Sequence, residues 1–151
     1  MATPVVKIVY ASMTGNTEEI AEIINDEFEK ANADVEMMTS DEASPEDFED
    51  ADICVVATYT YDEGDIPDDI IDFYDDLADV SLDGKIYGVA GSGDTFYEFF
   101  CKAVDDFDTR FKEIGATKGA DSVKVELSPE EDDIKHLETF VASLMDTYNN
   151  Q

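Results

Sequence analysis

The chain has little positive charge. Its 151 residues include 9 Lys and Arg against 39 Asp and Glu, a formal net charge of −30 at pH 7. Nucleic acids and anionic membranes attract proteins of the opposite sign, so the charge excludes both as partners. The N-terminus shows no basic-then-apolar leader, and no apolar run approaches the ~20 residues that span a bilayer. These absences predict a cytoplasmic protein.

Cysteine and histidine are almost absent. Cys54 and Cys101 are too few and too ill-spaced for a metal site or a disulfide framework, so we expect two free thiols. The single histidine, His136, lies in a helical apolar pattern and is expected at or near the surface rather than in catalysis. We therefore predict neither a catalytic residue nor a metal site. The apolar residues of that pattern are Ile134, Leu137, Val141, Leu144 and Tyr148.

The acidity does not indicate disorder. Hydrophobic residues make up 43% of the chain and aromatic residues 11%, and the length is that of one domain, residues 1–151. Residues 41–50 and 62–79 carry dense negative charge and are expected to face solvent. That charge has two interpretations, a docking surface for basic proteins or an adaptation to solubility and high salt, and the sequence does not separate them.

Five short runs read as strands. Four are continuous and rich in β-branched residues, as parallel strands buried on both faces are: Val5–Tyr10, Val35–Met38, Ile53–Ala57 and Ile86–Ala90. The fifth, Ser122–Leu127, alternates polar and apolar residues and is expected at a sheet edge, with Val123, Val125 and Leu127 pointing inward.

Helical apolar stripes separate and follow these runs. Pro67 and the pair Ser128-Pro129 mark two helix starts. Alternating strands and helices predict a doubly wound α/β domain with a five-stranded parallel sheet and helices on both faces. The expected buried residues are Ile20, Ile24 and Phe28 in one helix, Ile70, Tyr74 and Leu77 in another, and Phe100, Val104, Phe107, Phe111 and Ile114 in a third.

The turn Ser12–Thr17 lies between the first strand and the first helix. It is rich in hydroxyl groups and contains one glycine, which favours binding of an anion by backbone N–H groups. It has no Lys or Arg and fits neither the nucleoside triphosphate nor the three-glycine dinucleotide pattern. The expected ligand is therefore a small monophosphate group. The alternative is an ordinary capped helix start.

Open parallel sheets bind ligands beyond the carboxyl ends of their strands. The loops Ser12–Thr17, Thr58–Asp65 and Gly91–Cys101 follow the first, third and fourth strands. Aromatic rings in the last two predict a flat ligand between two walls. The alternative is that these rings only pack on neighbouring loops. They are Tyr59, Tyr61, Phe96 and Tyr97.

These three loops resemble the FMN loops of short-chain flavodoxins, and the resemblance covers nearly the whole chain. It implies strand order 2-1-3-4-5 and non-covalently bound FMN. It also implies a monomeric, low-potential carrier that shuttles single electrons between proteins and is not itself an enzyme. The implied partners are basic redox proteins, such as flavodoxin or ferredoxin reductases and acceptor oxidoreductases.

The resemblance assigns the FMN contacts residue by residue. For the phosphate it implies the side chains of Ser12, Thr14, Asn16 and Thr17 and backbone N–H groups of Met13 and Gly15. For the ring it implies Tyr61 and Tyr97 on the two faces and mainly backbone groups of Gly93, Asp94, Phe99 and Cys101. The remaining FMN contacts, not assigned to either end of the cofactor, are Thr58, Tyr59, Thr60, Asp62 and Ser92.

Asp62 departs from the family pattern. Many flavodoxins have glycine after the inner aromatic residue, and in the family this peptide turns over when the flavin accepts one electron. Asp at positive φ costs roughly 1 kcal/mol more than glycine. An Asp62→Gly variant should widen the gap between the two reduction potentials by about 50 mV, since ~59 mV corresponds to 1.4 kcal/mol for one electron. An unchanged gap in a potentiometric titration would discard the hypothesis.

Three other functions would need different features in the sequence. An FMN-dependent oxidoreductase of the quinone reductase type would need a substrate pocket over the ring. A specialist that activates a single enzyme, such as a ribonucleotide reductase, would need a narrower docking surface. A phosphate-responsive signalling domain would need an aspartate at the end of the first or third strand, and these end at Tyr10-Ala11 and Ala57-Thr58.

Overall fold

The computed structural model describes residues 3–11, 15–59, 66–93, 102–126 and 129–150. Its sheet is parallel throughout, and its strand order β2-β1-β3-β4-β5 confirms the predicted fold class. The strands are β1 (Val5–Tyr10), β2 (Asp34–Thr39), β3 (Ile53–Tyr59), β4 (Ile86–Gly93) and β5 (Thr117–Lys118), and β6 (Val123–Glu126) also pairs with β4.

The expected fifth strand is divided into two pieces. Tyr87 of β4 pairs with Lys118 and Ala90 pairs with Val123, so β4 advances three residues while its partner advances five. The break cannot be read from a polar–apolar alternation, because β5 is only two exposed residues long. Val125 is buried and Val123 is half-buried, as expected, whereas Leu127 lies outside the described residues.

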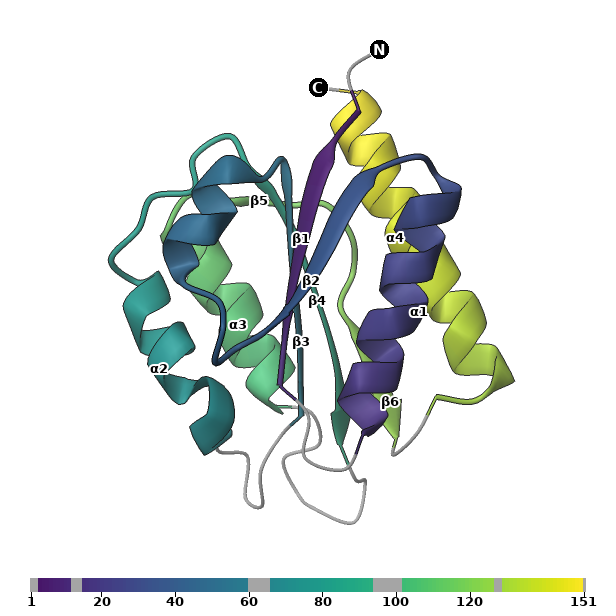
Figure 1. Ribbon diagram of the computed structural model, residues 1–151, viewed down its shortest axis with the longest axis horizontal. Coiled ribbons are helices and arrows are strands. Elements are labelled where there is room, and N and C mark those ends of the chain that lie inside the picture. Colours follow the sequence, from purple (N-terminus) through teal and green to yellow (C-terminus); the bar gives the residue numbers. More distant parts are fainter. Residues whose placement is uncertain (1–2, 12–14, 60–65, 94–101, 127–128, 151) are drawn as a thin grey trace.

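Helices cover both faces of the sheet (Figure 1). Helices α1 (Asn16–Lys30) and α4 (Glu131–Asn149) pack on one face, and the 3-10 helix η1 (Pro45–Asp50), α2 (Asp68–Leu77) and α3 (Lys102–Glu113) pack on the other. Each face therefore has its own apolar core. No helix in these described ranges is long and apolar enough to cross a membrane.

Most of the predicted stripes are buried, with exceptions in or directly after three helices. Ile114, directly after α3, and Tyr148 of α4 are half-buried, and Phe100 lies outside the described residues. Phe73 takes the core position of α2, while Tyr74 is only half-buried, with the Arg110 guanidinium 4.0 Å from its ring centroid. In α4, Ile134 is 37% exposed, and the helix begins at Glu131 rather than near Ser128-Pro129. The residues confirmed as buried are Ile20, Ile24, Phe28, Ile70, Leu77, Val104, Phe107, Phe111, Leu137, Val141 and Leu144.

The acidic segment 41–50 does not lie wholly in solvent. It contains η1, whose start is capped by Ser44 and Asp47 and whose Phe48 is fully buried. The Phe48 ring meets Phe73 edge-on with centroids 5.6 Å apart, and it lies 5.9 Å from the Phe111 ring. One aromatic residue therefore anchors this charged segment to the core.

Candidate functional site

The carboxyl ends of β1, β3 and β4 meet at one edge of the sheet, at the bottom of Figure 1. The Ala11 amide donates to the Ala57 carbonyl at 3.1 Å, and Tyr59 lies opposite Ser92 in the β3–β4 register. The strands that lead into the three predicted loops are thus adjacent.

Helix α1 begins at Asn16, directly after a glycine in the left-handed conformation. Its N-cap is Gly15, at φ 93°, and a Cβ there would meet no atom within 4 Å, so the left-handed backbone rather than crowding requires glycine. The starts of η1 and α4 each have a capping box. Residues 12–14, on which the alternative of an ordinary capped start depends, lie outside the described residues. A helix N-terminus of this kind is suited to an anion.

The side chains of Thr17, in the first turn of α1, and Ser92, near the end of β4, are in contact. Their hydroxyl oxygens are 2.8 Å apart, although the residues are 75 positions apart in the chain, and the side chains are 1% and 4% exposed. Buried hydroxyl groups need partners, and here each supplies the other's. This contact connects Thr17, the last residue of the first predicted loop, to Ser92, near the start of the third.

Tyr59 points its hydroxyl toward α2. It donates to an Asp69 carboxylate oxygen at 3.0 Å, and Ser40 Oγ donates to the Asp69 carbonyl at 2.6 Å. The neighbouring Thr58 is fully buried, and its hydroxyl donates to the Tyr59 carbonyl at 3.0 Å. Sequence reasoning missed Asp69 and Ser40. A carboxylate in the first turn after Pro67 was the available signal, because that position favours negative charge.

Gly91 allows β4 to pack closely at this edge. A Cβ at Gly91 would lie 2.3 Å from the Thr58 carbonyl oxygen and 2.5 Å from Val104 Cγ2 of α3. Any side chain here would displace β3 or α3, and so it would move the ends of the strands that frame the site.

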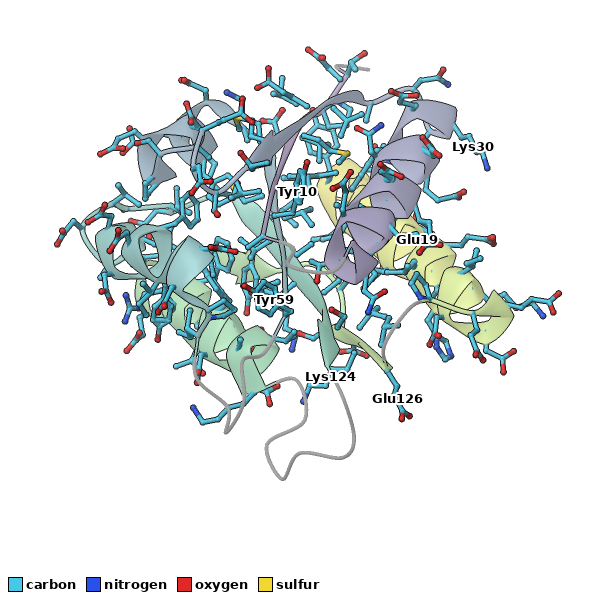
Figure 2. The ribbon with its side chains drawn as sticks, turned by 60° about the horizontal axis from the view of Figure 1, so that its bottom comes forward. Tyr10, Glu19, Lys30, Tyr59, Lys124 and Glu126 are labelled. Atoms are coloured by element: carbon cyan, nitrogen blue, oxygen red, sulfur yellow. The ribbon has the colours of Figure 1, made fainter. Side chains whose placement is uncertain are left out.

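The site edge carries a negative field. Tyr10, the last residue of β1, has its pKa raised by burial first and then by the carboxylates of Glu18, Glu42 and Glu22. Figure 2 shows Tyr10, Tyr59 and Glu19 from this side of the molecule. Added negative charge at this edge is therefore disfavoured.

Ten predicted contact residues lie outside the described residues. The other predicted contact residues lie at this edge of the sheet. They are Gly15, Asn16, Thr17, Thr58, Tyr59, Ser92 and Gly93. The predicted residues that the structure does not describe are Ser12, Met13, Thr14, Thr60, Tyr61, Asp62, Asp94, Tyr97, Phe99 and Cys101.

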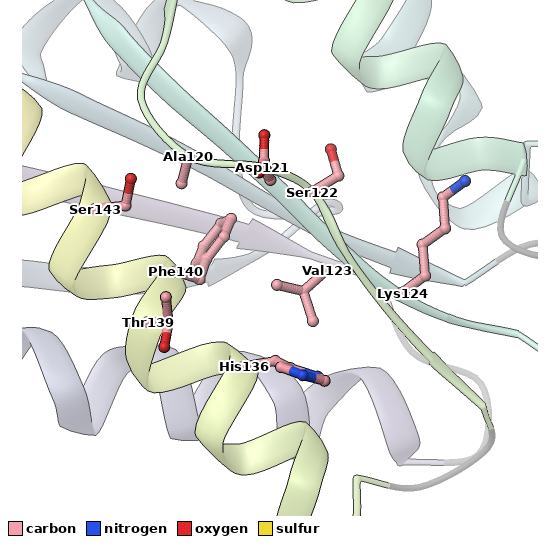
Figure 3. Close-up of a pocket in the computed structure, with 9 residues that line it drawn as sticks. All are labelled: Ala120, Asp121, Ser122, Val123, Lys124, His136, Thr139, Phe140 and Ser143. Atoms are coloured by element: carbon pink, nitrogen blue, oxygen red, sulfur yellow. The ribbon is translucent and has the colours of Figure 1, made fainter.

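His136 lies away from this edge, in a hollow of about 280 Å³ between α4 and the break in strand five (Figure 3). Its side chain is exposed, as predicted. Two polar side chains of the hollow are engaged elsewhere: Ser143 donates to the Gly119 carbonyl, and Lys124 donates to Asp105. Asp121 and Ser122 also line the hollow.

Cys54 is a free, fully buried thiol whose Sγ lies 3.7 Å from the Phe48 carbonyl oxygen. Burial raises its pKa to about 12, with a smaller raising contribution from Asp52 and lowering contributions from Lys85 and Lys7. It is thus an inert core thiol. The described ranges contain no group of three or more His, Cys, Asp or Glu side chains able to hold a metal ion.

Comparison with known proteins identifies the family to which the chain is similar. The flavodoxin family profile matches residues 8–140. The probable flavodoxin 2 of Bacillus subtilis is 41% identical over 136 residues, covering 88% of this chain and 89% of that protein. The solved flavodoxin of Streptococcus pneumoniae TIGR4 superposes with a TM-score of 0.93 at 56% identity, covering 95% of this chain and 99% of that one.

A solved short-chain flavodoxin associated with a PDU bacterial microcompartment gives a TM-score of 0.94 at 49% identity, with 96% and 99% of the two chains covered. Family and fold agree. The chain belongs to the flavodoxin family, whose members bind FMN and carry electrons rather than act as enzymes in their own right.

Proposed function

We propose that this chain is a low-potential one-electron carrier that holds FMN across the carboxyl ends of β1, β3 and β4. The observation that supports this most is the buried contact between Thr17, in the first turn of α1, and Ser92, at the end of β4. Hydroxyl and backbone donors at a helix N-terminus fit a phosphate group. When bound, FMN supplies the redox chemistry.

The chain's own residues would bind and orient the cofactor. Gly15, Asn16 and Thr17 would hold the phosphate, together with the predicted residues 12–14. Thr58, Tyr59, Ser92 and Gly93 would frame the ring with the predicted ring contacts. The carboxylates that raise the pKa of Tyr10 would also disfavour further negative charge on the flavin, and this would lower its potential.

A groove of about 430 Å³ between η1 and α2 is the candidate docking surface for basic redox proteins. Among the described residues, none of its carboxylates has an ion pair. Unpaired negative charge steers a basic partner by long-range attraction. The acidic residues that line the groove are Asp41, Glu46, Asp68, Asp69, Asp72, Asp76 and Asp79.

The implied partners are reductases and acceptor oxidoreductases with basic surfaces, met in the cytoplasm by a monomeric carrier. Transient electron-transfer complexes have small, charged interfaces, and a monomer leaves the acidic groove open to them.

A charge-reversal pair tests the proposal. Reduced protein is mixed with a basic c-type cytochrome at low ionic strength, and the second-order rate is followed by stopped flow. Asp72→Lys with Asp76→Lys should slow the reaction by roughly tenfold or more, because steering by local charge is lost. Glu138→Lys with Asp146→Lys, the same change in net charge on exposed positions of α4, should slow it less than about twofold.

Equal slowing by both pairs would show that net charge alone matters and would refute the groove as the docking surface. The cofactor is tested separately. Purified protein, or the apoprotein after FMN is added, should show bound-flavin absorption, and its absence would refute the site.

A further inference from the structure

The buried pair of Thr17 and Ser92 has a property that the family resemblance does not supply. Thr17 comes from the first turn of α1 and Ser92 from the end of β4, and their oxygens are 2.8 Å apart with either able to donate. Each hydroxyl group has one proton and two acceptor lone pairs. The direction of this hydrogen bond therefore decides which of the two still has a proton to offer a third group.

An anion at the α1 start requires one of the two directions. If Thr17 donates to Ser92, Thr17 presents only lone pairs to the anion, which is repulsive. If Ser92 donates to Thr17, the Thr17 proton is free to donate to the anion. Hydrogen bonds to a charged acceptor are roughly twice as strong as neutral ones, and donors in a chain polarise one another. A bound dianionic phosphate therefore selects the order Ser92 to Thr17 to phosphate.

We propose that Ser92 is a positioning residue for the FMN phosphate and acts through Thr17 rather than on the flavin ring. This rests on the proposed FMN site. The resemblance counted Ser92 among the FMN contacts without assigning it to either end of the cofactor, and its hydroxyl oxygen lies beside that of Thr17, at the phosphate end of the site.

The assignment gives Ser92 a second consequence. Ser92 lies opposite Tyr59 in the β3–β4 register and directly precedes Gly93, the last residue of β4. Phosphate binding that fixes the Ser92 hydroxyl also fixes the end of the strand that leads to the predicted ring contacts. Occupation of the phosphate site and order at the ring side should therefore favour each other.

Comparing FMN with riboflavin, which lacks the phosphate, separates this role from a purely structural one. Dissociation constants of both flavins for the apoprotein are measured by quenching of flavin fluorescence. Ser92→Ala should weaken FMN binding by about tenfold, because the Thr17 donor loses its polarising partner. Riboflavin binding should change by less than about twofold.

A double-mutant cycle tests whether Ser92 acts through Thr17. In a Thr17→Val background, Ser92→Ala should change FMN affinity by less than about twofold, because the relay is already broken. Ser143→Ala is the matched control. It removes a half-buried serine hydroxyl that donates to the Gly119 carbonyl, remote from the site, and should leave both flavin affinities unchanged.

Three results would overturn the inference: equal losses of FMN and riboflavin affinity in Ser92→Ala, additive losses in the cycle, or an unchanged FMN affinity. If Ser92→Ala does not fold, as judged by circular dichroism, Ser92→Cys takes its place. Its weaker donor should lower the ratio of FMN to riboflavin affinity by about threefold, and an unchanged ratio refutes the role. Failure of the wild-type apoprotein to bind FMN would instead refute the proposed function.

Discussion

The acidic residues are distributed unequally between two regions of the molecule. Residues 11–83, here the acidic half, contain 25 acidic residues and one basic residue, whereas residues 84–126, here the balanced segment, contain 8 acidic and 6 basic residues. Five of the six ion pairs among the described residues lie within the balanced segment. Among the described residues, the balanced segment pairs four of its carboxylates, whereas the acidic half pairs only Glu27, with Lys30.

The sheet order turns this difference along the chain into a difference in space. Strands β2 and β3 belong to the acidic half, and β4, β5 and β6 belong to the balanced segment, so the two regions occupy opposite sides of the sheet. A coat that served only solubility or high salt would need no such asymmetry. The comparison therefore favours the docking interpretation of the acidity.

The largest effect on stability is expected for Asp108, a carboxylate of the balanced segment with three hydrogen-bond or ion-pair partners. Asp108 accepts a hydrogen bond from Tyr87 Oη at 2.7 Å and lies 3.3 Å from the ammonium groups of Lys112 and Lys118. Asp108→Asn should lower the free energy of unfolding by about 2 kcal/mol, because charge-assisted hydrogen bonds are lost. Urea denaturation at a fixed FMN concentration measures it. Asp121→Asn, at an exposed position, is the control and should leave the free energy of unfolding nearly unchanged. A similarly small change for Asp108→Asn would contradict the argument.

The same carboxylate predicts a pH dependence. Burial acts to raise the pKa of Asp108, but hydrogen bonds from Tyr87, Lys112 and Lys118 and the charge of Lys118 outweigh it and lower that pKa below its usual 3.8. The stabilisation is therefore present above the unfolded pKa and lost as pH falls through the folded one. The difference in unfolding free energy between wild type and Asp108→Asn should be constant from about pH 7 to 5 and shrink by about 1 kcal/mol below pH 4. A constant difference at acid pH would rule out this origin.

Added salt should stabilise the protein mainly by screening the repulsion among the carboxylates of the acidic half. Raising NaCl from about 0.05 to 0.5 M shortens the screening length to a few ångströms and should raise the free energy of unfolding by about 1 kcal/mol. A variant with Asp72→Asn and Asp76→Asn should gain less from salt, because two of the repelling charges are absent. Equal gains in thermal or urea unfolding would show that the repulsion does not come from this region.

The smallest expected effect has the opposite sign. Asp76→Asn should raise the free energy of unfolding by about 0.4 kcal/mol, because it removes a like-charge pair with Asp72 one turn earlier and a negative charge near the C-terminal end of α2. Asp106→Asn is the matched change in the balanced segment. It breaks the 3.0 Å ion pair with Lys102 and should be neutral or slightly destabilising. Stabilisation by both would contradict the comparison.

Much of the fold was predictable, because local patterns dictate it. The run Val5–Tyr10 coincides with β1, since β-branched residues buried on both faces leave little choice of structure. Phe48 and the two-residue β5 were missed for opposite reasons. Phe48 is a lone aromatic residue among acids, and its burial depends on Phe73 and Phe111 from other elements. The β5 strand is defined only by its pairing with β4.

The sequence by itself determined the class of site. A hydroxyl-rich turn after a buried strand, together with two loops bearing aromatic residues, pointed to a phosphate-bearing flat ligand, because those groups supply the donors and the walls. Only the tertiary structure decided how the hydroxyl groups are used. It brought Ser92 to Thr17 across 75 residues and Asp69 to Tyr59. The physical reason is that a hydroxyl group's partner is set by distance in space, which spacing along the chain does not encode.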